Sequence, residues 1–241
     1  MKRTERHHLQ QNEFAEWLHH TRNWYAANKN LVLYGGIAIV VVAMGVGATL
    51  VVRQNTAANA SRMLAEAMTL AEAQVMPPVA GEAGKPPVQA PGTYPTDRAR
   101  LDAALPKLLA VAEAYPTNDA GLIARYRAAA ALVAVGRFDE GIQRYQEVIA
   151  KTTGVYQTMA KLGIADAQIT SRQFDPAIAS LKELAQQAGD MTPLDGILMQ
   201  LARAYTLAGK ADDARKTFKR VADEFPQSPY AEQARKELDT L

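Results

Sequence analysis

The order of apolar and polar positions divides the chain into a head, one long apolar run and a body. Residues 31–52 form 22 consecutive positions without a charged side chain. At a helical rise of about 1.5 Å per residue this run reaches about 33 Å, enough to cross a hydrocarbon core of about 30 Å. We therefore expect a transmembrane helix over 31–52, with a head over 1–30 and a body over 53–241.

The head repeats apolar side chains at spacings of three and four, which predicts an amphipathic helix. The positions in this pattern are Phe14, Trp17, Leu18, Thr21, Trp24 and Tyr25. Indole and phenol rings favour the headgroup layer of a bilayer, so Trp17, Trp24 and Tyr25 are candidate membrane-interface residues. The open alternative is a disordered tail that carries a few aromatic side chains.

The first part of the body combines a helical segment with a proline-rich one. Residues 56–76 have the composition of a helix. Residues 77–95 hold six prolines and three glycines, which favours a solvated loop inserted between two helices. A proline motif that binds a partner is the alternative for this insertion. We expect residues 53–119 to form a first, irregular repeat that contains it.

The rest of the body, residues 120–241, repeats itself. Three segments, which begin at Gly136, Arg172 and Gly209, align at offsets of 36 and 37 residues. Acidic, small and large apolar positions fall in register: Asp139, Asp175 and Asp212, then Gly141, Ala177 and Ala214, then Tyr145, Leu181 and Phe218. This repetition predicts stacked helix pairs, with first helices over 120–135, 156–170 and 194–208.

Each repeat also carries signals for where its helices begin and end. We expect the three aspartates to cap the second helices, and Pro176 to take the first helical position. Gly136 and Gly209 should end first helices. Pro106 should kink the helix that follows the insertion.

The pattern resembles the tetratricopeptide repeat, a helical hairpin of about 34 residues. The resemblance rests on Gly136, Gly141, Tyr145, Ala177, Ala202, Tyr205, Gly209, Ala214, Phe218 and Pro226. It implies an all-α solenoid of about three to four repeats, closed by a C-terminal capping helix.

The same resemblance implies a partner-binding groove, because the first helix of each pair lines the concave face of such arrays. The lining residues would be Ile123, Tyr126, Val133, Met159, Leu162, Asp166, Ile169, Met199, Arg203 and Leu207. This apolar lining suits a hydrophobic segment or a partner helix. The alternative is that the C-terminal helix or the 56–76 helix fills the groove.

The distribution of charge predicts how the chain is oriented in the membrane and argues against a nucleic-acid partner. The head holds five of the 27 basic residues and three of the 25 acidic ones, which leaves 22 of each in the body. A body without a basic excess argues against nucleic-acid binding. The basic head predicts a cytoplasmic N-terminus with the body across the membrane. Residues 58–60 resemble a signal-peptide cleavage site, but the apolar run is long for a signal peptide, so an uncleaved anchor is favoured.

The composition of the body offers little for catalysis. The chain has no cysteine, and all four histidines lie in the head. Histidine acid–base chemistry, cysteine nucleophiles and most transition-metal sites are therefore removed from the body. We expect no catalytic, cofactor or metal site, and protein partners instead.

The layout of basic-flanked anchor, aromatic head and repeats ending in FPQSPYAEQARKELDTL is similar to the YfgM-type family, the ancillary subunits of the SecYEG translocon. This resemblance implies a single-pass inner-membrane protein with periplasmic repeats, linked to the membrane chaperone PpiD, which acts as a scaffold or chaperone for secreted chains. The C-terminal repeats also resemble CpoB- and BamD-type envelope proteins. Envelope assembly or coordination of cell division is therefore the alternative, and an enzyme is the third and least favoured class.

Overall fold

A computed structural model describes residues 17, 18, 20–79, 87–187 and 193–241. Its elements after a helical head segment are α2 (Lys29–Ala71), β1 (Gln74–Val75), β2 (Thr93–Tyr94), α3 (Asp97–Ala114), α4 (Asp119–Ala134), α5 (Phe138–Lys151), α6 (Val155–Thr170), α7 (Phe174–Gln186), α8 (Leu194–Leu207), α9 (Ala211–Glu224) and α10 (Ala231–Thr240). The chain separates into two compact units, Met1–Thr56 and Ala57–Leu241.

The first unit contains the head and the apolar run. Described head residues 17, 18 and 20–27 are helical, and Trp17, Trp24 and Tyr25 are exposed. The run forms part of α2, and its large apolar side chains from Leu31 to Val52 are exposed as well. A helix that is apolar on every side needs a core or a membrane around it. Among the described residues, α2 is the one helix long and apolar enough to be a candidate membrane span.

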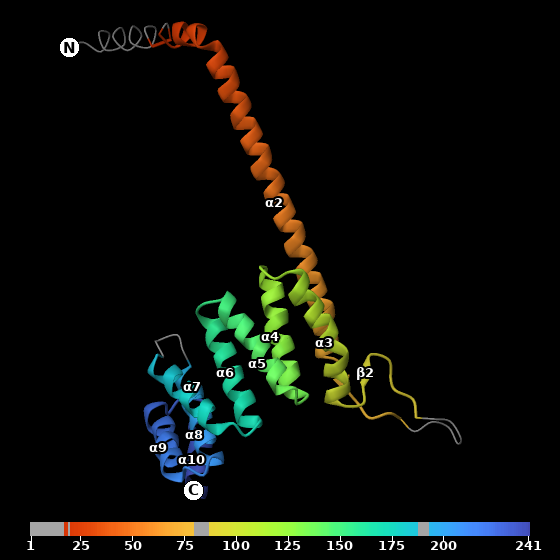
Figure 1. Cartoon of the computed structure of the whole chain (residues 1–241), viewed down its shortest axis with the longest axis vertical. Helices are drawn as coiled ribbons and strands as arrows, with labels where there is room; N and C mark the ends of the chain where they lie inside the picture. Colours follow the sequence, from red (N-terminus) through yellow and green to blue (C-terminus); the bar gives the residue numbers. More distant parts are fainter. Residues whose placement is uncertain (1–16, 19, 80–86, 188–192) are drawn as a thin grey trace, which may run out of the picture. The chain divides into compact units, whose positions relative to one another are not determined.

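The second unit is an all-α solenoid. Each helix from α3 to α10 packs against the next one in the chain, so that helical hairpins follow one another in sequence order (Figure 1). Contacts also join α4 to α6 and α6 to α8. These first helices of three successive hairpins therefore lie side by side and form one face of the array. The predicted all-α repeat fold is confirmed.

The first helices begin and end close to the predicted positions, but the capping prediction is wrong. The second helices α5, α7 and α9 have Arg137, Gln173 and Lys210 as their N-cap residues, and none of them caps with its side chain. Asp139, Asp175 and Asp212 each lie in the first turn instead, as the second helical residue. A carboxylate there still interacts favourably with the helix dipole.

The two helical prolines lie at different places: Pro176 differs from the predicted position, and Pro106 lies within a helix as the sequence indicates. Pro176 is the third residue of α7, not the first. Proline is tolerated there because the first four N–H groups of a helix have no partner within the helix. Pro106 lies inside α3, which continues through it as one helix from Asp97 to Ala114.

The tight turns within the three hairpins share one backbone conformation. Gly136 and Gly209 have φ of 84° and 73°, and Arg172 takes the equivalent place with φ of 63°. In each turn, the N–H of the following residue donates a hydrogen bond to the carbonyl oxygen five residues earlier. The distance from Gln173 N to the Gln168 carbonyl oxygen is 2.7 Å. Glycine adopts this left-handed conformation freely, whereas arginine pays a steric cost.

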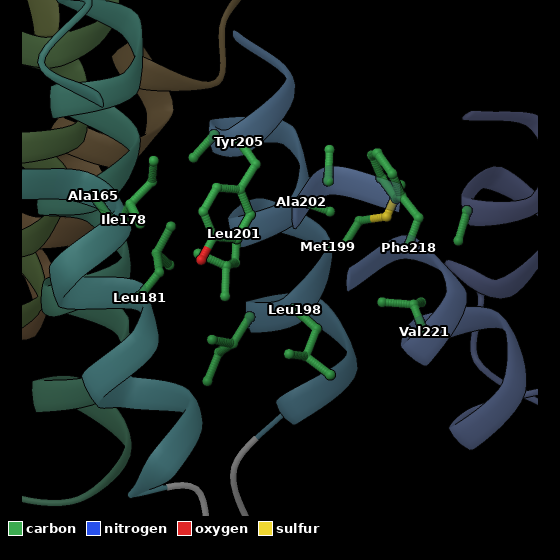
Figure 2. Close-up of a cluster of buried hydrophobic side chains, with 14 of the residues drawn as sticks. Ala165, Ile178, Leu181, Leu198, Met199, Leu201, Ala202, Tyr205, Phe218 and Val221 are labelled. Carbon is green, nitrogen blue, oxygen red and sulfur yellow. The ribbon is translucent and has the colours of Figure 1, made fainter. Parts of the chain in front are cut away.

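The hydrophobic core changes character along the solenoid. Helices α6 to α10 share one large cluster of buried residues that includes Leu181, Leu198, Phe218 and Val221 (Figure 2). Helices α3 to α6 and residues 57–71 of α2 enclose smaller clusters, rich in alanine, around Leu108, Leu132 and Val148. The side chains of Leu64 and Met68 pack against these clusters, so residues 57–71 belong to the same packed unit as α3 and α4.

The proline-rich insertion has an ordered base. Gln74 and Val75 pair with Thr93 and Tyr94 as a parallel ladder, and an antiparallel bridge joins Val79 to Val88. The Gln89 amide also donates to the Met76 carbonyl at 3.0 Å. The strand β1 therefore lies just before the predicted loop and β2 lies near its end. The predicted 56–76 helix ends earlier, at Ala71. Residues 80–86 lie outside the described part.

Candidate partner-binding surface

The face formed by α4, α6 and α8 carries most of the predicted groove residues with part of their surface accessible. Met159 and Leu207 are 38% and 58% exposed, and Asp166 and Arg203 are exposed too. The half-buried members are Ile123, Tyr126, Val133, Leu162 and Ile169. An apolar surface that contains one acidic and one basic side chain is thus available to a partner.

Met199 is a correction to the predicted groove. Only 1% of its surface is exposed, and it belongs to the core that α8 shares with α9 and α10. Figure 2 shows its sulfur directed toward Phe218. The capping helix α10 packs on α9 and contributes Ala234 to this core. Met199 therefore faces the core of the solenoid and not a surface open to a partner.

A buried tyrosine of α5 packs against a glycine of α6. A Cβ on Gly163 of α6 would lie 2.3 Å from the Tyr145 ring, so only glycine allows the ring to approach this closely. Tyr145 in turn packs edge-to-face against Tyr126 of α4, with ring centroids 5.4 Å apart. The pair fixes the position of the Tyr126 ring beside α6.

Asp166 lies one turn along α6 from Gly163, on the same side of the helix. Its surroundings remove water from the carboxylate and raise its pKa above the ordinary 3.8, while Arg203 on α8 acts in the opposite direction. Burial likewise raises the pKa of the Tyr126 hydroxyl; the positive charge of Arg127 opposes this rise and the negative charge of Asp166 adds to it. Asp166, Arg127 and Arg203 thus all act on this part of the surface.

The Asp166 carboxylate is exposed, so water can hydrate it. Its backbone carbonyl accepts a hydrogen bond from the Thr170 hydroxyl at 2.9 Å.

A second polar group, which sequence reasoning missed, lies inside the packing of α4. Arg125 is 4% exposed. Its Nε lies 3.0 Å from Glu147 Oε2, outside hydrogen-bond geometry, and its Nη2 donates to the Ala112 carbonyl at 2.8 Å. Arg144 extends the cluster by contacting Glu147 and Glu113. The signal in the sequence was an arginine on the otherwise apolar face of the first helix.

The residues of the predicted repeat signature fall into two structural groups. Seven are buried between helices: Gly141, Tyr145, Ala177, Ala202, Tyr205, Ala214 and Phe218. A Cβ on Gly141 would lie 2.6 Å from Val133 Cγ2, so this glycine permits the close approach of α4 and α5. Gly136 and Gly209 form the turns described above, and Pro226 follows the end of α9.

A comparison with known families matches one part of the solenoid. Residues 197–228 match the tetratricopeptide repeat family. No curated protein matches the sequence. Crystal structures of nearly identical tetratricopeptide-like repeats of a kinesin light chain from Podosopora anserina align with 58% of this chain and 76% of theirs, at 18% identity and a TM-score of 0.49. A single-substitution variant of that protein aligns over the same shares with 19% identity and a TM-score of 0.49.

The arrangement is that of a protein–protein interaction scaffold. The repeat hairpins present a continuous face of first helices, and protein partners are what such repeats bind. Among the described residues, no group of three or more histidine, cysteine, aspartate or glutamate side chains could hold a metal ion. The chemistry that the surface offers is therefore apolar contact with a few polar groups.

Proposed function

We propose that this protein is a membrane-tethered scaffold or chaperone on the periplasmic face of the inner membrane, which assists the translocation and folding of secreted or envelope proteins. One observation carries the proposal: a repeat solenoid with a partly exposed apolar face follows a helix that is a candidate membrane span. A scaffold fixed beside a bilayer meets chains that emerge from the membrane before they diffuse away.

The orientation rests on charge. Five basic residues precede the apolar run, and Arg53 and Arg62 are the basic residues that follow it closely. This excess favours a cytoplasmic head and a periplasmic solenoid. The proposed membrane helix covers 31–52, the irregular first repeat 53–119 and the remaining repeats 120–241, with Trp17, Trp24 and Tyr25 at the cytoplasmic interface.

Site-specific crosslinking in intact membranes tests the proposal. A photoreactive amino acid at Leu162 of α6 or at Leu207 of α8 should capture translocon subunits or translocating chains. The same amino acid at Lys219, which is exposed on α9, provides the matched control and should capture them much less. Equal capture at Lys219, or capture of none of these partners at Leu162 and Leu207, would overturn the proposal.

Protease accessibility tests the orientation separately. Protease added outside spheroplasts should digest the solenoid and spare the head. A protected solenoid would reverse the orientation. A solenoid released from the membrane in intact cells would instead indicate that the anchor is cleaved, as in the CpoB-type alternative.

A further inference from the structure

The middle hairpin of the solenoid contains a small cavity between its two helices, α6 and α7. The cavity has a volume of about 120 Å³, and its lining residues are Lys161, Ile164, Ser180, Glu183 and Leu184. On a helix of 3.6 residues per turn, Lys161 and Ile164 lie on a different side of α6 from the predicted groove residues Leu162 and Asp166. This cavity is therefore separate from the surface of the proposed function, and the inference goes beyond that function.

The register of the repeats explains why the cavity is open in this hairpin. Helices α6 and α7 begin 36 residues after α4 and α5. The equivalents in the preceding hairpin are therefore Arg125 for Lys161, Arg144 for Ser180 and Glu147 for Glu183. There, Arg144 contacts Glu147 at 3.2 Å, and Arg125 reaches the same carboxylate at 3.0 Å. The short side chain of Ser180 thus leaves a cavity at the place that a long arginine takes in the preceding hairpin.

The third hairpin closes the same place in another way. The equivalents 37 positions after the cavity residues are Leu198, Thr217 and Arg220. Leu198 is fully buried, and Arg220 pairs with Glu224 at 2.8 Å. Apolar packing therefore replaces the polar cluster in that hairpin. The middle hairpin keeps polar groups like those of the preceding one but lacks the side chain that joins them.

The two charged groups of the cavity are not paired with each other. Among the described residues, Lys161 forms no hydrogen bond or ion pair, whereas its equivalent Arg125 forms both. Glu183 accepts a hydrogen bond from Gln187 at 3.0 Å and, in the described part of the chain, forms no ion pair. Lys161 and Ser180 are half-buried and Glu183 is exposed. Water can reach all three, so they remain available to an incoming polar group.

We propose that this cavity binds the carboxamide of a glutamine side chain from a partner protein. The amide oxygen accepts a hydrogen bond from the Lys161 ammonium group, and the amide nitrogen donates one to the Glu183 carboxylate. The methylene groups of the glutamine contact Ile164 and Leu184. A volume of about 120 Å³ equals that of about four water molecules, which suits one side chain and excludes a helix.

Charge complementarity selects an uncharged occupant. An acidic side chain would be attracted by Lys161 but repelled by Glu183, and a basic side chain would meet the opposite pair of forces. A carboxamide carries both an acceptor and a donor and is repelled by neither residue. An apolar side chain would cover both charged groups without replacing their water.

Methyl NMR of the full chain in lipid nanodiscs tests this site, because Ile164 and Leu184 report from inside the cavity. The probes are propionamide, which is the side-chain analogue of glutamine, and its close analogues butanone, propionate and butylammonium. Propionamide should shift both methyl resonances and bind about tenfold more tightly than each of the other three, the effect of about one hydrogen bond. The methyl resonances of Leu108, in a separate cluster, should not move.

A peptide probe connects the cavity to a protein partner. A glycine–serine peptide with one central glutamine should shift the same two methyl resonances, whereas the same peptide with a central glutamate should not. Binding of propionamide without binding of the glutamine peptide would mean that the cavity takes a small amide, and would overturn the proposed occupant.

Variants assign the binding to the cavity residues. Ser180→Arg restores the arginine of the preceding hairpin and should fill the cavity, pair with Glu183 and abolish the shifts, with thermal unfolding unchanged or raised. Lys161→Met keeps the length of the side chain but removes the donor, and should weaken propionamide binding about tenfold. Lys219→Met, at an exposed position of α9, is the matched control and should leave the affinity unchanged.

Several outcomes would overturn the inference. These are equal binding of the four small probes, tightest binding of propionate or butylammonium, and the absence of shifts with any probe. Shifts that persist in a folded Ser180→Arg variant would place the probe elsewhere. If that variant does not fold, Lys161→Met decides, and an unchanged affinity for propionamide overturns the site. Crosslinking at Leu162 and Leu207 tests the other surface and is independent of all these results.

Discussion

The two halves of the solenoid reach the same fold through different contacts. Helices α7 to α10 pack around one apolar cluster centred on Phe218, in which the buried residues are aliphatic or aromatic. Helices α3 to α5 pack around smaller, alanine-rich clusters and enclose the charged Arg125 with its partner Glu147. The family match at residues 197–228 lies entirely in the apolar half.

The difference between the two halves explains why the repeat pattern is clearer in the C-terminal half of the sequence. In the C-terminal half the residues typical of the repeat make the contacts themselves, so the sequence carries the pattern openly. In the N-terminal half Gly141 and the Arg125–Glu147 pair provide equivalent packing with unusual side chains. Repeat arrays tolerate such variation because each hairpin contacts only its neighbours.

The largest expected effect is a loss of stability that is confined to the apolar half. Phe218→Ala removes a fully buried ring and should destabilise the protein by about 3–5 kcal/mol. Because the cluster is local, hydrogen exchange should accelerate in α7 to α10 and change little in α3 to α5. Lys219→Ala, at the adjacent exposed position, is the control. Equal acceleration in both halves would show that the solenoid unfolds as one cooperative unit.

The second effect concerns the charged half. Glu147→Gln leaves the buried Arg125 without its ion-pair partner and should cost about 2–3 kcal/mol, less than for a fully buried pair because the Glu147 side chain is 32% exposed. Adding Arg125→Met should recover part of the loss, since no buried charge remains. Urea unfolding of the two variants measures both values.

Glu140→Gln is the matched control for that experiment. Glu140 lies on the same helix and pairs with Arg137 at 2.6 Å, but at an exposed site, so its substitution should have little effect. If adding Arg125→Met destabilises the Glu147→Gln variant further instead of restoring stability, Arg125 and Glu147 are not energetically coupled.

The third effect compares the turns. Arg172→Gly should stabilise the protein by about 1 kcal/mol, because glycine adopts the left-handed conformation without steric cost, whereas Gly209→Ala should destabilise it by a similar amount. Thermal unfolding of both variants checks this. A loss of stability in Arg172→Gly would mean that the arginine side chain contributes more than its backbone costs.

The smallest effect is a pH dependence at Asp166, between the two halves. Its raised pKa means that the folded state binds the proton more tightly than the unfolded state. Ionisation therefore costs stability: the cost is absent below pH 3.8, grows as the pH rises through the folded-state pKa and is complete above it. Asp166→Asn should gain stability relative to the parent protein over this interval in urea titrations. The opposite trend would mean that attraction to Arg203 outweighs desolvation.

Sequence periodicity predicted the helices of the repeats well, because apolar spacing and the offset between repeats depend on local contacts. The first helices α4, α6 and α8 begin and end close to the expected residues. The capping prediction was wrong for Asp139, Asp175 and Asp212, because the helix starts that follow the left-handed turns lie two residues earlier than predicted. Short-range geometry of that kind is not encoded in residue type alone.

The parts of the surface that depend on distant residues could not be predicted. Met199 is buried because it faces α9, in the core that contains Phe218 about twenty residues later in the chain. The pairing of Arg125 with Glu147 joins two different helices, and the approach of Tyr145 to Gly163 joins two others. Each requires the hairpins to be assembled first.

The paired base of the proline-rich insertion has a consequence for how the protein can vary. Residues 74–75 pair with residues 93–94, and Arg100 donates a hydrogen bond to the Ala73 carbonyl at 3.3 Å. The two ends of the segment between residues 75 and 93 are therefore held close together. Doubling the length of a closed loop costs only about 0.6 kcal/mol. Related chains can thus lengthen, shorten or replace this segment without altering the repeats, which makes it a natural place for lineage-specific additions and for an inserted epitope or fluorescent label.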